Sequence, residues 1–216
     1  MSVLICICSK YPNPLLYTCV KSLYDIQIKN DLNNLKYKIC IIDSNSDNYS
    51  NYDEVKNIYP DIELHYIKNK NYEYGAWKYI QEIYSDSDYY FCIQDTIIIQ
   101  KYIDLKIINN NNVYIHYHMS GFNSHMEIKQ KGIKILQNSN IDYHTLIDTN
   151  FNLAQHSTFI VNNFIMKDIF KFLTIPPVDK EESCCYERIF GIYFIIKNII
   201  THDIQSYVNK YNGYRN

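Results

Sequence analysis

The sequence predicts a single α/β domain in which a mostly parallel sheet is flanked by helices. Over the first 100 residues, short apolar segments typical of strands alternate with segments whose apolar residues recur at helical spacing. This alternation implies parallel strands joined by right-handed helical crossovers. A chain of 216 residues suits one sizeable hydrophobic core, and we find no internal repeat or linker that would divide it.

Four strands are expected in the amino-terminal half, at residues 3–8, 37–42, 62–67 and 88–96. The third alternates apolar and polar residues and is expected nearer an edge, whereas the others are continuous apolar runs that suit strands buried on both faces. Pro12 and Pro14 exclude a helix before about residue 14 but favour a start there. Further helices are expected over residues 53–58, ended by Pro60, and from Gly75 onward.

The carboxyl-terminal half is patterned less regularly. Residues 97–103 predict a strand or a short helix, and two clearer strands are expected at residues 113–117 and 156–161. The polar tail, residues 203–216, is expected to form a last helix followed by disorder. Helices are also expected at residues 128–136, at residues 164–173, and from Asp179 or Lys180 to Ile199.

Composition argues against some classes of protein. Lys and Arg number 21 against 23 Asp and Glu, so the formal net charge of −2 offers no basic excess to neutralise the phosphates of a nucleic acid. No run approaches the roughly 18 apolar residues of a membrane span, and the apolar amino terminus lacks the length and basic residues of a signal peptide. Seven cysteines without zinc-ligand spacing suit reduced thiols. We therefore expect a cytoplasmic protein without a nucleic-acid partner.

Polar residues stand where the expected strands end. Ser9, Asp43 and Asp95 each follow a strand, and Gly75 opens the helix after another. The carboxyl ends of parallel strands meet at one edge of a sheet, where ligands bind. A glycine lets a ligand approach the helix N-terminus, and carboxylates can bind ribose, base or a divalent cation. A nucleotide diphosphate would fit this set, although strand ends often carry a single Asp simply as a turn or cap residue.

Taken in order, these segments resemble a GT-A-fold glycosyltransferase, nearest to the inverting, family-2-like group. They are also similar to small domains that large DNA viruses encode to glycosylate their own proteins, which would imply a host cytoplasm. The likeness covers residues 3–100 and continues more loosely through residues 156–160 and 187–191. The segments that carry it are Ser9, Cys-Ile-Ile-Asp-Ser-Asn-Ser-Asp at 40–47, Asn-Lys-Asn-Tyr-Glu-Tyr-Gly-Ala-Trp-Lys at 69–78 and Tyr-Phe-Cys-Ile-Gln-Asp at 90–95.

The resemblance implies a nucleotide diphosphate sugar, such as a UDP-sugar, as donor of a hexosyl or deoxyhexosyl group. It implies a glycan or glycoprotein as acceptor. Residues 1–100 would form the donor-binding half, and residues 101–216 the acceptor-side half. Asp43 matches the residue that holds the nucleoside in that family. The residues expected to bind the donor are Ser9, Asp43, Gly75, Lys78 and Gln94.

The resemblance also implies Mn²⁺ or Mg²⁺, bound at a DXD-type motif that ends the fourth strand. Here the sequence departs from the pattern, because Gln94, Asp95 and Thr96 supply one carboxylate in place of two. One Asp still suits such ions, since they keep several waters and take phosphate oxygens as ligands. The literal Asp-Ser-Asp at residues 86–88 precedes the buried strand and is expected at the opposite end of the sheet. His202 is a candidate further ligand, although a surface histidine near a helix C-terminus is the commoner explanation.

An inverting transfer needs a general base to take the proton of the acceptor hydroxyl. The family places it on a late helix, where Glu181, Glu182 and Glu187 are candidates. Glu187 is the first choice, because it lies in Glu-Arg-x-x-Gly, which is similar to the acceptor-side segment of the family. Glu182 is the second choice. A surface ion pair explains Glu187 equally well.

Two other functions remain open. A catalytically degenerate domain that binds sugar nucleotides without turnover is supported by the missing second carboxylate. A nucleotidyltransferase also uses a parallel sheet and carboxylate-bound Mg²⁺, but it predicts a glycine-rich basic loop after the first strand. Residues 9–14 contain Lys10 and no glycine, which disfavours that alternative.

Overall fold

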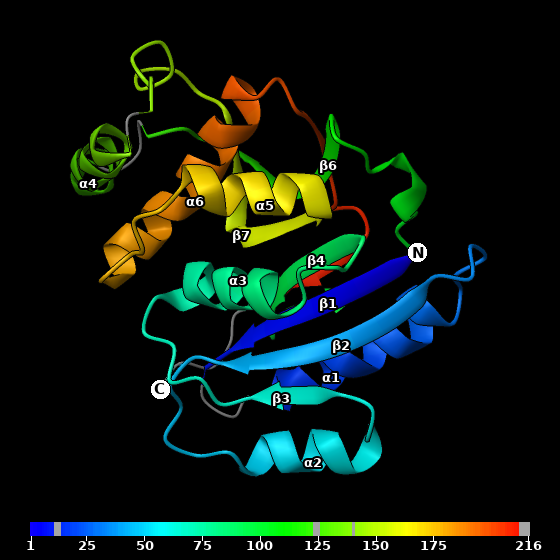
Figure 1. Ribbon diagram of the computed structural model, residues 1–216. Coiled ribbons are helices and arrows are strands. Elements are labelled where there is room, and N and C mark those ends of the chain that lie inside the picture. Colours follow the sequence, from blue (N-terminus) through cyan, green and yellow to red (C-terminus); the bar gives the residue numbers. More distant parts are fainter. Residues whose placement is uncertain (11–13, 123–125, 140, 212–216) are drawn as a thin grey trace.

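A seven-stranded sheet with helices on both faces forms the centre of the molecule (Figure 1). A computed structural model describes residues 1–10, 14–122, 126–139 and 141–211. Among the sheet's strands only β7 runs antiparallel to its neighbours, β4 and β6. The prediction of one α/β domain with a mostly parallel sheet is therefore confirmed. Across the sheet the order is β3 (Glu63–His65), β2 (Lys36–Asp43), β1 (Ser2–Ser9), β4 (Tyr89–Gln94), β7 (Asn152–Asn162), β6 (Asn112–Met119) and β8 (Ile200–Asp203).

The helices divide between the two faces of this sheet. One face packs against α3 (Tyr72–Ile83), α4 (Met126–Asn138), α5 (Asn163–Phe172) and α6 (Lys180–Ile196). The other face packs against α1 (Pro14–Ser22), its π-helical continuation η1 (Leu23–Ile28) and α2 (Ser50–Ile58). Because side chains alternate along a strand, β1 gives Leu4, Cys6 and Cys8 to the first core and Val3, Ile5 and Ile7 to the second. This explains its unbroken apolar run.

Capping residues set where the late helices begin. The Oδ1 atom of Asn162 accepts from the backbone N–H of Ile165 at 3.0 Å, and α5 starts at the next residue. Asp179 Oδ1 likewise accepts from Glu182 N at 2.8 Å at the start of α6. Such bonds satisfy amides that have no partner within the helix. These caps fix the beginnings of both helices close to the predicted positions.

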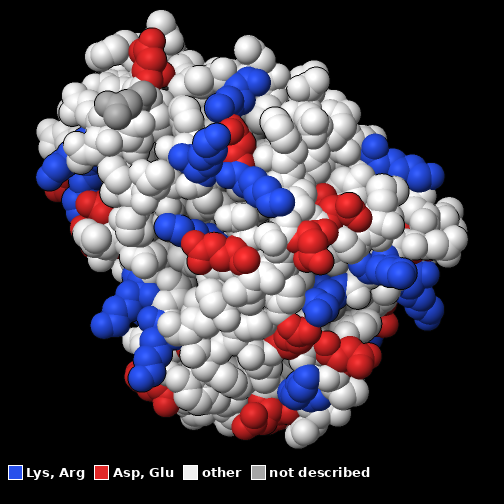
Figure 2. Space-filling view, in the orientation of Figure 1, with Lys and Arg blue, Asp and Glu red and all other residues white. Residues whose placement is uncertain are grey.

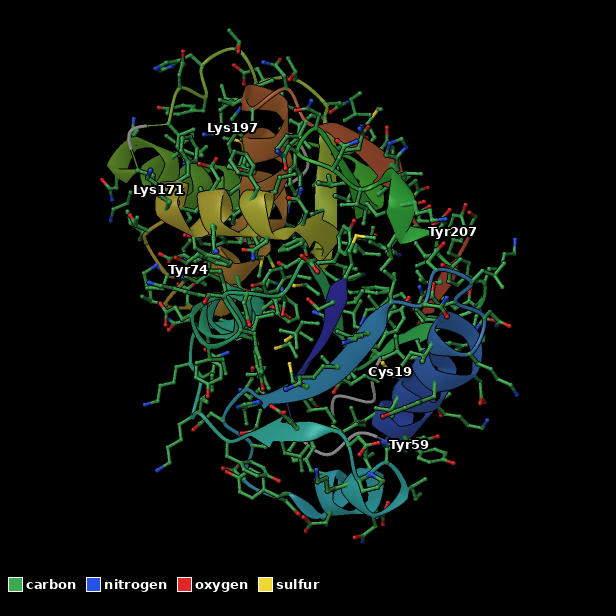
Figure 3. All side chains as sticks on the ribbon, turned by 45° about the vertical axis from the view of Figure 1, so that its right-hand side comes forward. Cys19, Tyr59, Tyr74, Lys171, Lys197 and Tyr207 are labelled. Carbon is green, nitrogen blue, oxygen red and sulfur yellow. The ribbon has the colours of Figure 1, made fainter. Side chains whose placement is uncertain are left out.

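Aromatic packing joins α3 to the helices beside it. Tyr74 lies between α3 and the layer formed by α5 and α6 (Figure 3), and its hydroxyl donates to the carbonyl of Leu173 at 2.7 Å. Its ring centroid lies 5.3 Å from that of Phe170 and 4.7 Å from that of Tyr186. The amino-terminal end of α3 is thereby held against α6, and this contact positions the candidate site.

The tail differs from the prediction. Residues 203–211 contain no helix; instead β9 (Val208–Lys210) pairs antiparallel with β5 (Ile97–Ile99) in a separate two-stranded sheet. The expected last helix is therefore wrong over these residues, and residues 212–216 lie outside the described part of the chain. A three-residue strand whose hydrogen bonds go to a segment more than a hundred residues away leaves no periodic signal in its own sequence. The pairing brings Lys210 opposite Ile97, next to the end of β4.

The surface carries mixed charge. Figure 2 shows basic and acidic side chains interspersed over the face that it draws, without a continuous field of one sign. All seven cysteines are free thiols, and six of them are buried. Within the described ranges, no helix has both the length and the apolar character needed to cross a membrane.

Candidate functional site

The carboxyl ends of the central strands meet as the strand-end argument predicts. Ser9 Oγ, at the end of β1, donates to Asp95 Oδ2 at 2.8 Å, and the backbone N–H of Asp95 donates to the carbonyl of Cys8 at 3.2 Å. On the other side of β1, Ser44 N donates to Ser9 O at 2.8 Å, so that β2 ends beside it. Ser9, Asp43 and Asp95 all lie at least nine-tenths buried at this edge.

Asp43 is held by the turn that follows β2. Its carboxylate accepts from the backbone N–H of Ser46 at 3.1 Å and from the Tyr52 hydroxyl at 2.9 Å. A carboxylate has about four acceptor positions, so these bonds leave capacity for a ligand N–H or O–H. Asp43 therefore does stabilise the turn after β2, which was the alternative interpretation of its sequence position. These bonds orient its carboxylate and leave acceptor positions for a ligand.

Gly75 does not open the site to a ligand. It lies in the first turn of α3, and a Cβ added there would come 2.1 Å from Asn69 Oδ1. Asn69 fills that space, because its amide donates to Tyr72 O at 2.6 Å and to Ser44 Oγ at 3.2 Å. The expected role of Gly75 is corrected: the glycine makes room for an asparagine that ties α3 to the end of β2.

Gln94 faces a buried acid that the sequence reasoning missed. Its Nε2 donates to Glu73 Oε1, while Ser183 Oγ donates to Glu73 Oε2 at 3.1 Å. Glu73 is 9% exposed and so connects β4, α3 and α6 at this edge. A signal was present, since Glu73 precedes the buried Trp77 by four residues and therefore lies on the inward face of the helix.

Lys78 lies half-buried midway along α3. Six residues separate it from Tyr72, which corresponds to about 9 Å along the helix axis. Its expected place in the donor site stays a prediction.

Glu187 is a half-buried acid of α6 with a perturbed pKa. Its Oε1 accepts from the backbone N–H of His156 at 3.0 Å. Burial raises its pKa from 4.5 to about 7, although the His156 bond and the nearby Arg188 and Lys180 lower it, and Glu73 raises it further. A carboxyl group with a pKa near the working pH is suited to general base catalysis.

The backbone that holds Glu187 is strained. His156 and Ser157, in β7, have φ angles of 58° and 49°, in the left-handed region that non-glycine residues rarely adopt. The segment is fixed on two sides, because Glu187 accepts from His156 N and Trp77 Nε1 donates to Ser157 O at 2.9 Å. Such strain persists where surrounding contacts over-determine it, and it concentrates at functional sites.

The other two acids of α6 serve its amino terminus. Glu182 Oε2 accepts from the backbone N–H of Val178 at 2.9 Å, just before the Asp179 cap, so it satisfies a further amide at the start of α6. Glu181 forms a surface ion pair with Lys131 of α4. The geometry therefore favours Glu187 over Glu182 as base.

His202 lies elsewhere. It belongs to β8, where its Nε2 is 3.2 Å from Asn112 Oδ1. Because β7, β6 and β8 follow β4 across the sheet, His202 is separated from Asp95 by three strand spacings, or roughly 14 Å. The expectation that His202 and Asp95 bind one ion is therefore corrected.

Asp95 remains the protein group that could hold a metal ion. Within the described ranges, no three His, Cys, Asp or Glu side chains gather into a group that could bind one. Mg²⁺ is usually bound through one or two carboxylates, with substrate phosphates and water completing its shell. Asp95, which lies at the end of β4 and accepts a hydrogen bond from Ser9, could supply one such carboxylate. Beside it, Lys210 Nζ donates to Thr96 Oγ1.

An open hollow of about 570 Å³ lies at the opposite edge of the sheet, where β1 and β4 begin. Asp88 lines it, and its Oδ2 accepts from Ser2 N at 2.7 Å. The Asp-Ser-Asp of residues 86–88 therefore precedes β4, as predicted, and lies away from Asp95.

Comparison with known proteins identifies the fold. No protein-family model and no curated protein matches the sequence. A crystal structure of S. aureus TarS matches with a TM-score of 0.55 at 8% identity, over 96% of this chain and 36% of that one. A structure of TarS residues 1–349 in complex with UDP matches with a TM-score of 0.56 at 13% identity, over 96% of this chain and 60% of that one.

The chain has the GT-A glycosyltransferase fold that these structures share. At such low identity the likeness shows the fold alone. The chain also spans less than two thirds of either TarS chain. The activity must therefore be argued from the site.

Proposed function

We propose that this protein is a glycosyltransferase that transfers a hexosyl or deoxyhexosyl group from a UDP-sugar to a glycan or glycoprotein. The proposal rests on the combination, in a GT-A fold, of strand-end carboxylates with the half-buried Glu187, which accepts from His156 N and whose pKa is raised to about 7. The UDP bound to TarS, in a structure of the same fold, supports UDP as the first nucleotide to test. Residues 1–100 would bind the donor, and the rest would supply the acceptor side.

In the proposed reaction, the acceptor hydroxyl attacks the anomeric carbon from the side opposite the diphosphate. Glu187 takes the hydroxyl proton as the new carbon–oxygen bond forms, and the bond to the diphosphate breaks, which inverts the anomeric configuration. His156 N fixes the orientation of Glu187 Oε1. Asp43 binds the base or ribose of the nucleoside.

Asp95 would hold the Mn²⁺ or Mg²⁺ ion that the fold family implies. When bound, that ion offsets the negative charge that develops on the departing diphosphate. Ser9 Oγ, which donates to Asp95 Oδ2, keeps the carboxylate at the end of β4. A likeness to viral domains stays a prediction, since the two TarS structures described above come from S. aureus.

Calorimetry with UDP, GDP and dTDP, each with Mn²⁺, tests the donor site. We expect UDP to bind to the parent protein, and Asp95→Ala to weaken that binding in the presence of Mn²⁺. Absence of binding to all three nucleotides, with Asp95→Ala indistinguishable from the parent, would refute the proposal.

A catalytically degenerate domain is the second candidate, favoured by the single carboxylate at the end of β4. It predicts nucleotide binding without release of UDP from any UDP-sugar, so a turnover assay separates the two. The argument against a nucleotidyltransferase rests on the loop after β1, of which residues 11–13 lie outside the described part of the chain.

A further inference from the structure

Lys210 lies beside the end of β4 because of the pairing of β9 with β5. In that pairing Lys210 stands opposite Ile97, and the backbone N–H of Tyr211 donates to Thr96 O at 3.0 Å. The ammonium of Lys210 donates to Thr96 Oγ1, and Thr96 directly follows Asp95. The carboxyl-terminal strand thus brings a cation to the proposed diphosphate position.

The Lys210 ammonium and the Asp95 carboxylate both act on one buried residue near the end of β4. Cys19, a buried residue of α1 that Figure 3 labels, has its Sγ atom 4.0 Å from the carbonyl oxygen of Gln94 at the end of β4. Burial raises the pKa of its thiol, Asp95 raises it further and Lys210 lowers it. Both charges therefore lie at the carboxyl edge, where Lys210 contacts Thr96 and Asp95 contacts Ser9.

The charge pattern fits a diphosphate. One carboxylate and one ammonium carry no net charge between them, so this edge repels an incoming diphosphate less than two carboxylates without a metal ion would. Where the sequence has a single acid, Asp95, the fold adds the cation of Lys210. A lysine binds phosphate as a compact point charge with three donors.

We propose that Lys210 Nζ binds the diphosphate of the donor and stays bound to the departing nucleoside diphosphate. The inference rests on the proposed function and extends it, because retention of the donor then depends on the protein's own cation as well as on any bound metal ion. A purely structural role, in which Lys210 only anchors β9 to Thr96, is the alternative to be tested.

Calorimetry of UDP and of uridine, each in Mn²⁺ and in EDTA, separates phosphate contacts from nucleoside contacts. We expect the parent to bind UDP measurably in EDTA. Lys210→Met should weaken UDP binding at least about tenfold, as expected for the loss of a charge-assisted hydrogen bond, and leave uridine binding unchanged. Lys210→Arg should retain most of the affinity. The matched control is Lys171→Met, on the exposed side of α5 (Figure 3), which should bind UDP like the parent.

Three outcomes would overturn the inference. If Lys210→Met binds UDP as well as Lys171→Met does, the ammonium does not contact the diphosphate, while the proposed function stands. If uridine and UDP are weakened equally, Lys210 supports the fold and not the phosphates. If the parent binds no UDP, both the inference and the proposed function fall. Lys210→Gln, which keeps a donor toward Thr96 without the charge, replaces the methionine variant if circular dichroism shows that the latter is unfolded.

Discussion

Replacing Glu187 with glutamine should abolish transfer and, at the same time, stabilise the fold at alkaline pH. The variant keeps an oxygen that can accept from His156 N and replaces the other carboxylate oxygen with an uncharged NH₂ group. Burial raises the pKa of Glu187 from 4.5 to about 7. Ionising the group in the folded chain therefore costs about 3 kcal/mol more than in the unfolded chain, as an upper value.

The sign of the effect follows from the raised pKa. Below about pH 4.5 Glu187 is protonated in both states and its burial carries no charge penalty. Between that pH and about 7 the unfolded chain loses the proton first, so the parent loses stability as the pH rises. Glu187→Gln should therefore exceed the parent by up to about 3 kcal/mol at pH 8, and by much less at pH 5.

Urea unfolding at pH 5 and pH 8 measures this difference, and the pH dependence of kcat/KM measures the activity. We expect kcat/KM of the parent to rise with pH through about 7, because the base must be ionised to take a proton. Glu181→Gln, on the exposed side of the same helix, is the control. Equal stabilities of the parent and Glu187→Gln at pH 8, or activity retained by the variant, would refute the reasoning.

Four further variants test the other residues. In calorimetry, Asp43→Ala should weaken the binding of uridine and of UDP to the same extent. Asp95→Ala should lose only the part of the UDP affinity that Mn²⁺ adds. If both variants weaken uridine binding equally, these roles are contradicted. Asp88→Asn, at the opposite edge of the sheet, should bind UDP like the parent. Gly75→Ala should lower the free energy of unfolding by about 1–3 kcal/mol, because its methyl group would displace Asn69; unchanged urea unfolding would contradict that.

The part of the site that sequence could predict is the part set by sheet topology. Ser9 and Asp95 end strands whose apolar runs are unmistakable, and parallel strands leave no choice about which ends meet. Their contact, Ser9 Oγ to Asp95 Oδ2 at 2.8 Å, follows from the order of the strands. Glu187 was found through a resemblance in sequence, but its burial and its bond to His156 needed the fold.

The parts of the site that the sequence did not predict depend on contacts between segments that are distant in the chain. Lys210 reaches Thr96 only because β9 pairs with β5, and nothing in the local sequence of the tail indicates a strand. His202 was expected near Asp95, but the strand it occupies lies at the far edge of the sheet. Gly75 suggested an open backbone, whereas the side chain of Asn69 fills the space.

The central claim is that this GT-A domain transfers sugar with Glu187 as the base. Release of UDP from a panel of UDP-sugars, with the anomeric configuration of the released or transferred sugar followed by NMR, tests it most directly. We predict that the parent releases UDP with inversion, that Glu181→Gln does the same and that Glu187→Gln does not. UDP binding without release from any donor, or release unaffected by Glu187→Gln, would contradict the claim.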